Sequence, residues 1–237
     1  MTISARGRLI VALDTRTAAD ALSLVTRLAE SVRFYKVGLE LVMNGGIDLV
    51  RTLKRQGKSV FLDMKLLDIE NTVERATANA AALGVTFLTV HGHDLKTLRA
   101  AVAGRGQSPT KLLAVTVLTN LTRADLSEQK IEMEPADLVV HRARLAREAG
   151  CDGIVASGLE SSCIRAAVGS ALFIVTPGIR LAGGAADDQT RTVSPHDAIT
   201  GGADYLVVGR PITQATDPRS VADAIVDQIE GAQRGRA

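Results

Sequence analysis

The strongest constraint on the fold is the alternation of short apolar runs, rich in β-branched residues, with longer stretches of helical spacing. This alternation is typical of βα units and predicts a parallel sheet. We expect about eight strands, the number in a closed (β/α)8 barrel, or TIM barrel. The expected strands are 9–13, 34–37, 59–64, 87–90, 112–118, 153–156, 173–175 and 205–208. The expected helices are 17–30, 71–83, 95–103, 135–149, 161–168 and 220–229.

The main alternative fold is an open, doubly wound α/β sheet, which uses the same local units. Such folds usually carry a glycine-rich turn after the first strand, whereas this chain has Asp14-Thr15-Arg16-Thr17 there. No G-x-G-x-x-G or G-x-x-x-x-G-K-[ST] motif occurs, which disfavours a dinucleotide or P-loop nucleotide. With 237 residues, of which 46% are hydrophobic, we expect one barrel domain over residues 1–237.

Composition also limits the partners. A formal net charge of +2, without a basic run, argues against a nucleic acid polymer. No apolar run reaches the roughly 18 residues that a membrane helix needs, and residues 1–9 lack the apolar core of a secretory signal. We therefore expect a cytoplasmic protein with no membrane partner. Cys151 and Cys163 have no metal-ligand spacing, and we expect both to be buried and reduced.

Charged residues gather where the first three expected strands end. Asp63 and Lys65 would point to the same side of the third strand, with Asp68 on the loop that follows. Asp14 ends the first strand and Lys36 lies in the second. Each alone could be a strand-end ion pair or a helix cap, but barrel enzymes collect reactive groups at this rim. Their convergence predicts a charged catalytic site.

A second group of motifs follows the last two strands. Thr176-Pro177-Gly178-Ile179-Arg180 opens a long polar loop, and Val207-Val208-Gly209-Arg210-Pro211-Ile212 follows the eighth strand. Glycines, two arginines and the next helix N-terminus can bind a phosphate, which barrels often hold at these loops. A tight turn with a solvated arginine is the plainer interpretation of Gly-Arg alone. We expect the loop at about 178–192 to act as a lid. The four histidines, His91, His93, His141 and His196, form no convincing metal set.

These motifs resemble those of a known family. The segment Asp63-Met64-Lys65-Leu66-Leu67-Asp68-Ile69, continued by Asn71-Thr72-Val73, is similar to the D-x-K-x-x-D-I-x-x-T-V signature of orotidine 5′-phosphate decarboxylases. Four further features follow the family's order. Residues 11–14 resemble its first strand, 35–38 its second strand, 176–180 with 188–189 its phosphate lid, and 208–212 its closing phosphate motif.

The resemblance implies decarboxylation of orotidine 5′-monophosphate to uridine 5′-monophosphate, without metal or organic cofactor. Lys65 would donate a proton to C6, Asp63 would face the departing carboxylate, and Lys36 would position Asp63 and the ribose. Asp68 and Thr72 would reach across a homodimer interface into the partner's site. The remaining substrate contacts implied are Asp14 to ribose, Thr119 beside the pyrimidine, and Arg180, Gln189, Gly209 and Arg210 to phosphate.

Two departures and two alternatives remain. Many members have histidine and proline where this chain has Leu67 and Glu70, which bears on loop packing. The 3-keto-gulonate 6-phosphate decarboxylases and hexulose-phosphate synthases share the D-x-K-x-x-D pattern, but they use Mg²⁺ and have an acidic residue at the position of Lys36. A cation there would repel the metal. A phosphosugar-binding barrel without catalysis would explain the phosphate motifs but not the charged rim.

Overall fold

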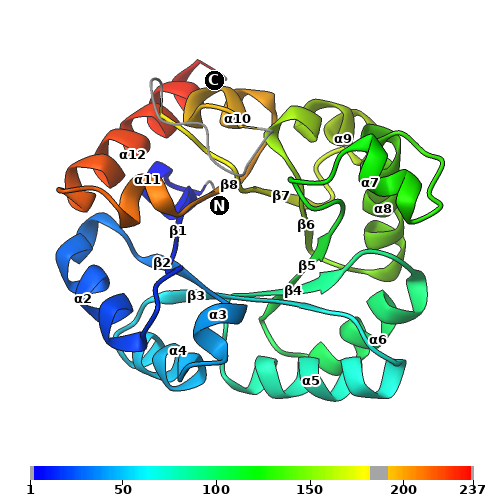
Figure 1. Cartoon of the computed structure of the whole chain (residues 1–237), viewed down its shortest axis with the longest axis horizontal. Coiled ribbons are helices and arrows are strands. Elements are labelled where there is room, and N and C mark those ends of the chain that lie inside the picture. The colour runs from blue at the N-terminus through cyan, green and yellow to red at the C-terminus, as the bar shows by residue number, and fades with distance from the viewer. Residues whose placement is uncertain (1–2, 182–191, 236–237) are drawn as a thin grey trace.

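The computed structural model describes residues 3–181 and 192–235, and within them eight parallel strands close into a barrel. Each strand pairs with the next in the chain, and β8 pairs with β1 (Figure 1). The predicted (β/α)8 barrel is confirmed. The strands are β1 Leu9–Ala12, β2 Phe34–Gly38, β3 Ser59–Leu66, β4 Phe87–His91, β5 Lys111–Val115, β6 Gly153–Val155, β7 Phe173–Thr176 and β8 Tyr205–Val208.

Helices surround the ring of strands (Figure 1). Polar caps fix where several of them begin: Thr17 accepts a hydrogen bond from Asp20 N, and Asp94 accepts one from Thr97 N. The α-helices are α1 Ala5–Arg8, α2 Ala18–Leu28, α3 Leu39–Val42, α4 Gly46–Arg55, α5 Glu70–Ala82, α6 Leu95–Arg105, α7 Arg123–Glu128, α8 Pro135–Ala149, α9 Ser161–Val168, α10 Pro195–Gly201, α11 Arg210–Thr213 and α12 Pro218–Arg234. Two short 3₁₀ helices are η1 Ala29–Ser31 and η2 Gly158–Glu160.

Helix α4 was not predicted, because Gly45-Gly46 resembles a loop. Gly45 caps the helix in the left-handed conformation, with φ +80°. A Cβ on Gly46 would lie 2.5 Å from Leu41 O, so the chain can pass this point only without a side chain. The pair of glycines therefore starts a helix here.

The barrel has one core between strands and helices and a second inside the ring. The inner core contains aromatic residues at the first positions of their strands: Phe34, Phe87 and Tyr205 pack with ring centroids 5.0–6.1 Å apart. This aromatic cluster fills the amino end of the barrel. Open space is thereby left to the carboxyl end.

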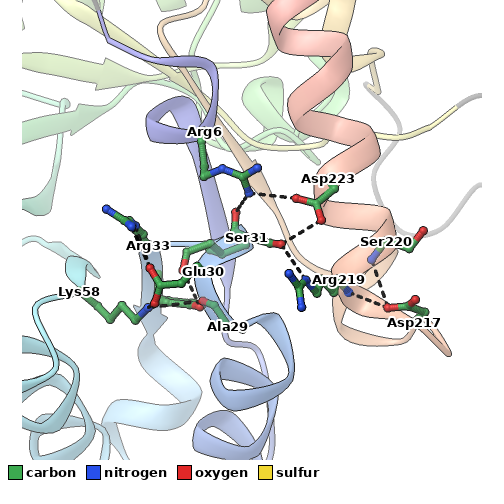
Figure 2. A network of polar contacts seen from close by, with 12 residues as sticks. Arg6, Ala29, Glu30, Ser31, Arg33, Lys58, Asp217, Arg219, Ser220 and Asp223 are labelled. Atoms are coloured by element: carbon green, nitrogen blue, oxygen red, sulfur yellow. Dashed lines mark hydrogen bonds and ion pairs between the residues drawn. The ribbon is translucent and has the colours of Figure 1, made fainter.

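A polar network joins the segments that precede the first strands to α12, and we call it the α1–α12 network (Figure 2). Arg6 donates to Ser31 O at 2.7 Å and to Asp223 Oδ1 at 2.9 Å. Ser31 Oγ donates to Asp223 Oδ2 at 2.9 Å, and Arg219 Nε donates to Ser31 Oγ at 3.3 Å. These contacts fasten the start of the chain to its last helix.

The cysteine prediction was half right. Cys151 is buried, and its burial raises the pKa of its thiol to about 12. Cys163 is exposed on α9, so the expectation that it is buried was wrong. The helical spacing of α9 placed Cys163 next to the buried Ile164 in sequence but on the outer face.

Within the described ranges, no helix combines the length and the apolar character that crossing a membrane would require.

Candidate active site

A cavity of about 440 Å³ opens at the carboxyl end of the barrel. Its charged lining comes from the end of β1, from β2 and β3, and from the loops after β7 and β8. Its apolar lining comes mainly from inward-facing strand positions: Ala12, Phe61, Val115, Val155 and Val207. A mostly apolar pocket of this size with a few converging polar groups is the usual form of a small-molecule site.

Four predicted residues form a row of alternating charge along one wall. Lys36 Nζ lies 3.0 Å from Asp14 Oδ1 and 3.5 Å from Asp63 Oδ2. Lys65 Nζ lies 2.8 Å from the same Asp63 Oδ2. Asp63 and Lys36 are largely buried, with side chains 11% and 12% exposed, whereas Lys65 is 28% exposed and Asp14 54% exposed. The row therefore runs from solvent at Asp14 to a buried centre and back toward the cavity at Lys65.

Burial and charge oppose each other in the middle of the row. Burial acts to raise the pKa of Asp63, but Lys36 and Lys65 outweigh it and lower that pKa below its ordinary value. Burial acts to lower the pKa of Lys36, but Asp63 and Asp14 outweigh it and raise that pKa. Both groups therefore stay ionised at neutral pH despite being buried.

The backbone under the row is irregular. The β3–β4 register shifts between Leu62 and Leu66, and Lys65 has a left-handed φ of +48°. Lys65 N donates to Thr89 Oγ1 at 3.0 Å, and that hydroxyl donates to Asp63 Oδ1 at 2.8 Å. A β-bulge of this kind re-aims a side chain next to a site. Here it turns Lys65 so that its ammonium meets Asp63 from the cavity side.

The predicted phosphate residues follow β7 and β8, next to the β1 end of the charged row. Arg180, Gly209 and Arg210 line the same cavity as the charged row, and Thr119 lines it from the segment after β5. A Cβ on Gly209 would lie 3.5 Å from Asp14 Oδ2, an ordinary van der Waals distance, so Gly209 lies directly beside the start of the charged row. Gly178 has φ +78°, which lets the chain turn sharply after β7. Two guanidinium groups on a cavity wall suit an anion.

Two predicted residues, Asp68 and Thr72, do not line this cavity in the single chain, and a third cannot be placed in it or outside it. Asp68 is exposed on the β3–α5 loop, where its Oδ1 accepts from Ile69 N at 2.6 Å. Thr72 is exposed in the first turn of α5. Gln189 lies outside the described residues, as does most of the predicted lid at 178–192.

Sequence reasoning missed Thr89 and Gln214. Gln214 lines the cavity just after α11, four residues beyond Arg210, and that spacing could have indicated it. Thr89 lies inside a strand of ordinary β composition, so no local signal marked it. Only the pairing of β3 with β4 brings its hydroxyl to Asp63.

His91, the last residue of β4, and His93, which follows the strand, lie beside the site. The rings of His91 and His93 are 4.6 Å apart between centroids. Burial, followed by the neighbouring His93, lowers the pKa of His91 to about 4, so its ring is neutral at pH 7. Over the ranges 3–181 and 192–235, no group of three or more His, Cys, Asp and Glu side chains is arranged to hold a metal ion.

Comparisons with known proteins agree with this geometry. The family model described as "Orotidine 5'-phosphate decarboxylase / HUMPS family" matches residues 7–225. An orotidine 5′-phosphate decarboxylase of Rhodopseudomonas palustris (strain BisA53) is 53% identical over 230 residues, which are 97% of each chain. One of Nitrobacter winogradskyi is 51% identical, over 97% of this chain and 95% of the relative. A solved structure of an orotidine 5′-phosphate decarboxylase from Lactobacillus acidophilus superposes with a TM-score of 0.82 at 37% identity, over 93% of this chain and 98% of that one.

Proposed function

Because the chain belongs to the orotidine 5′-phosphate decarboxylase / HUMPS family, we propose that it converts orotidine 5′-monophosphate to uridine 5′-monophosphate and CO2 without a cofactor. The observation that carries the proposal is the row Asp14–Lys36–Asp63–Lys65 in one cavity with Arg180 and Arg210. The row suits a reaction that develops negative charge on carbon, and the arginines suit a phosphate tail.

The chemistry begins with breakage of the bond between C6 of the pyrimidine and its carboxylate. The bonding electron pair stays on C6, and CO2 leaves. A fixed ammonium close to C6 stabilises this charge as it develops, and a preorganised charge needs no reorganisation during the step. Lys65 is the candidate, since its side chain is the more exposed of the two lysines toward the cavity. It then gives a proton to C6, forming the C–H bond of the product, and regains a proton from water.

Asp63 has two tasks in this scheme. Its Oδ2, 2.8 Å from Lys65 Nζ, holds the ammonium in a fixed place. Because the pKa of Asp63 is lowered, it is also an anion beside the position proposed for the substrate carboxylate. Repulsion there would be relieved as CO2 leaves. Lys36 balances Asp63 from the other side at 3.5 Å and, with Asp14, lies where ribose hydroxyls would bind.

The phosphate would bind after β7 and β8, to Arg180, Arg210 and the backbone at Gly209, with Thr119 near the pyrimidine. Gln189 is proposed as a further phosphate contact from the family motif. Binding energy gained there, away from the breaking bond, can be used to organise the charged row. A substrate without the phosphate should therefore react slowly.

We also propose a homodimer in which Asp68 and Thr72 complete the partner's site. Both are exposed in the single chain. Large apolar side chains are exposed on the segments after the neighbouring strands β2 and β3: Leu39 50%, Met43 86%, Leu67 51% and Ile69 72%. Such clusters mark interaction surfaces, and this one adjoins Asp68. Leu67, which departs from the family pattern, would then pack in the interface.

Mixing two inactive variants tests the shared site. Asp68→Ala and Lys65→Ala chains should regain activity when mixed, because a hybrid dimer has one site with both groups intact. At random exchange roughly a quarter of the sites are restored. Proven subunit exchange without any regained activity would contradict the shared site.

The magnesium-dependent branch of the family is the second candidate, and the residues argue against it. Lys36 Nζ, between two carboxylates at 3.0 and 3.5 Å, already supplies the positive charge that a metal would bring.

The cytoplasmic location expected from the sequence stays a prediction.

An absorbance assay on orotidine 5′-monophosphate, with and without EDTA, tests the proposed function. We expect equal turnover in both. Loss of turnover with EDTA and recovery with Mg²⁺, accompanied by turnover of 3-keto-gulonate 6-phosphate, would favour the second candidate. Binding of the nucleotide with no turnover at all would favour a non-catalytic barrel.

A further inference from the structure

Thr89 is a fully buried residue in the middle of β4, with 0% exposure. Its side chain faces the carboxyl half of β3. The hydroxyl oxygen accepts a hydrogen bond from Lys65 N at 3.0 Å, and the hydroxyl proton goes to Asp63 Oδ1 at 2.8 Å. One hydroxyl therefore contacts the backbone of one charged residue and the carboxylate of the other.

The first of these contacts supports an unusual backbone. Leu62 pairs with Leu88 and Leu66 pairs with Val90, so β3 advances four residues over a length in which β4 advances two. Thr89 is the β4 residue that lies opposite the extra residues of β3. Lys65, within this part of β3, has φ +48°, one of three positive values among non-glycine residues in the described part of the chain. A lysine in this conformation needs the surrounding structure to hold it, and the Thr89 hydroxyl accepts its N–H where the regular ladder is broken.

The second contact fixes how the Asp63 carboxylate is turned. Oδ1 is held by Thr89, which leaves Oδ2 to meet Lys65 Nζ at 2.8 Å and Lys36 Nζ at 3.5 Å. Without the hydroxyl, the carboxylate could rotate and share its oxygens differently between the two lysines. The same hydroxyl thus contacts both members of the Lys65–Asp63 ion pair.

We propose that Thr89 is a positioning residue for the decarboxylation: through one hydroxyl it holds the left-handed turn at Lys65 and the orientation of Asp63, and so aims the Lys65 ammonium. This inference rests on the proposed function, because it concerns the same site.

Other buried threonines offer a contrast. Thr77 on α5 is also 0% exposed, yet among the described residues its hydroxyl finds no hydrogen-bond partner. The fold therefore tolerates a buried threonine for its shape alone. Thr89 differs in using both its donor and an acceptor, and in contacting two charged residues of the cavity.

The test compares Thr89→Val, which keeps the shape and removes the hydroxyl, with Thr89→Ser, which keeps the hydroxyl. For Thr89→Val we expect kcat on orotidine 5′-monophosphate to fall about 10- to 100-fold, with KM changed less than about 3-fold. Thr89→Ser should keep kcat within about 3-fold of the wild type. The control Thr77→Val should leave both constants unchanged.

The pH profile adds a readout that a packing defect would not move. Asp63 is faced by Lys36 from β2, Lys65 on β3 and His91 on β4, with Asp14 beyond Lys36. Removing the Thr89 donor weakens the ionised form, so the pKa of Asp63 should rise. The acid limb of kcat should therefore move to higher pH in Thr89→Val but not in Thr77→Val.

A crystal structure of Thr89→Val keeps the inference testable whatever the substrate is. We expect Lys65 to leave its left-handed φ or the Asp63 carboxylate to rotate away from Lys65. An unchanged bulge and carboxylate, or Thr89→Ser losing as much activity as Thr89→Val, would overturn the positioning role. If the wild type itself leaves orotidine 5′-monophosphate intact, the proposed function fails, while this structural comparison still decides the role of Thr89.

Discussion

The first three strands of the barrel carry charged networks at both ends, and the two networks differ in burial and in surroundings. At the carboxyl ends, Asp63 and Lys36 are 11% and 12% exposed and face a cavity. At the amino ends, Arg6 and Asp223 are 41% and 39% exposed, and the α1–α12 network joins chain segments at the surface (Figure 2).

The same types of charged residue therefore have different roles, depending on whether they face a cavity or water. Surface pairs gain little, because water screens them and ordering long side chains has an entropic cost. Buried pairs of opposite charge have a desolvation cost in free energy, and they are found where a fixed charge is useful for function. The carboxyl-end row is therefore expected to control turnover, and the amino-end network is expected to affect stability only slightly.

The largest expected effect comes from Lys65 in β3, and a lysine just before the other end of the strand serves as its control. Lys65→Ala should lower kcat/KM by at least about 10⁴-fold, since it removes both the cation beside C6 and the proton donor. Lys58 directly precedes β3 at its other end, 3.4 Å from Glu30, and Lys58→Ala should stay within about 3-fold of the wild type. Steady-state assays on orotidine 5′-monophosphate measure both. Similar losses of kcat/KM in the two variants would mean that the carboxyl and amino ends of β3 affect turnover alike.

Two arginines extend the comparison to substrate binding. Arg210→Ala should raise KM about 10- to 100-fold, because charge-assisted hydrogen bonds to phosphate are lost, and should change kcat less. Arg219, in the α1–α12 network, is the matched control, and Arg219→Ala should leave KM unchanged. An unaltered KM in Arg210→Ala would refute the phosphate assignment.

The pH dependence sharpens the account of the row. The lowered pKa of Asp63 means that its carboxylate stays ionised as pH falls from about 7 to about 5, so kcat should be constant over that range. Lys36→Met removes the strongest influence that lowers this pKa, so the opposing effect of burial is offset less and the pKa of Asp63 should rise. The acid limb of kcat should therefore move to higher pH in Lys36→Met. Equal profiles for the variant and the wild type would contradict the coupling.

The smallest effect is expected in the amino-end network. Arg6→Ala removes a half-exposed ion pair with Asp223, which should lower the free energy of unfolding by about 0.5–1 kcal/mol. The hydrogen bond to Ser31 O is also lost. Urea denaturation measures the stability, and kcat should be unchanged. A large fall in kcat would mean that the two ends are coupled.

Much of the fold was predictable because strand and helix periods alternate clearly. The boundaries were less so: β3 continues to Leu66 rather than ending at Met64, because a bulge keeps the chain paired beyond Asp63. Helix α4 was not predicted, because Gly45-Gly46 is typical of a loop, whereas here the two glycines start a helix. Such features depend on contacts with distant residues.

The site was predictable where residues lie at strand ends. Asp14, Lys36, Asp63 and Lys65 were expected to converge, and they lie within ion-pair distance along one row. Thr89 could not be found this way, because its role comes from strand pairing. In the proposed homodimer Asp68 would enter the site of a second chain, and a single sequence does not position that chain.

A crystal structure of the protein with bound uridine 5′-monophosphate tests the proposed site most directly. The account predicts C6 of the pyrimidine next to Lys65 Nζ, the ribose hydroxyls at Asp14 and Lys36, and the phosphate on Arg180 and Arg210. A nucleotide bound in the reverse direction, with its phosphate at Lys36 and Lys65, or bound outside this cavity, would contradict it.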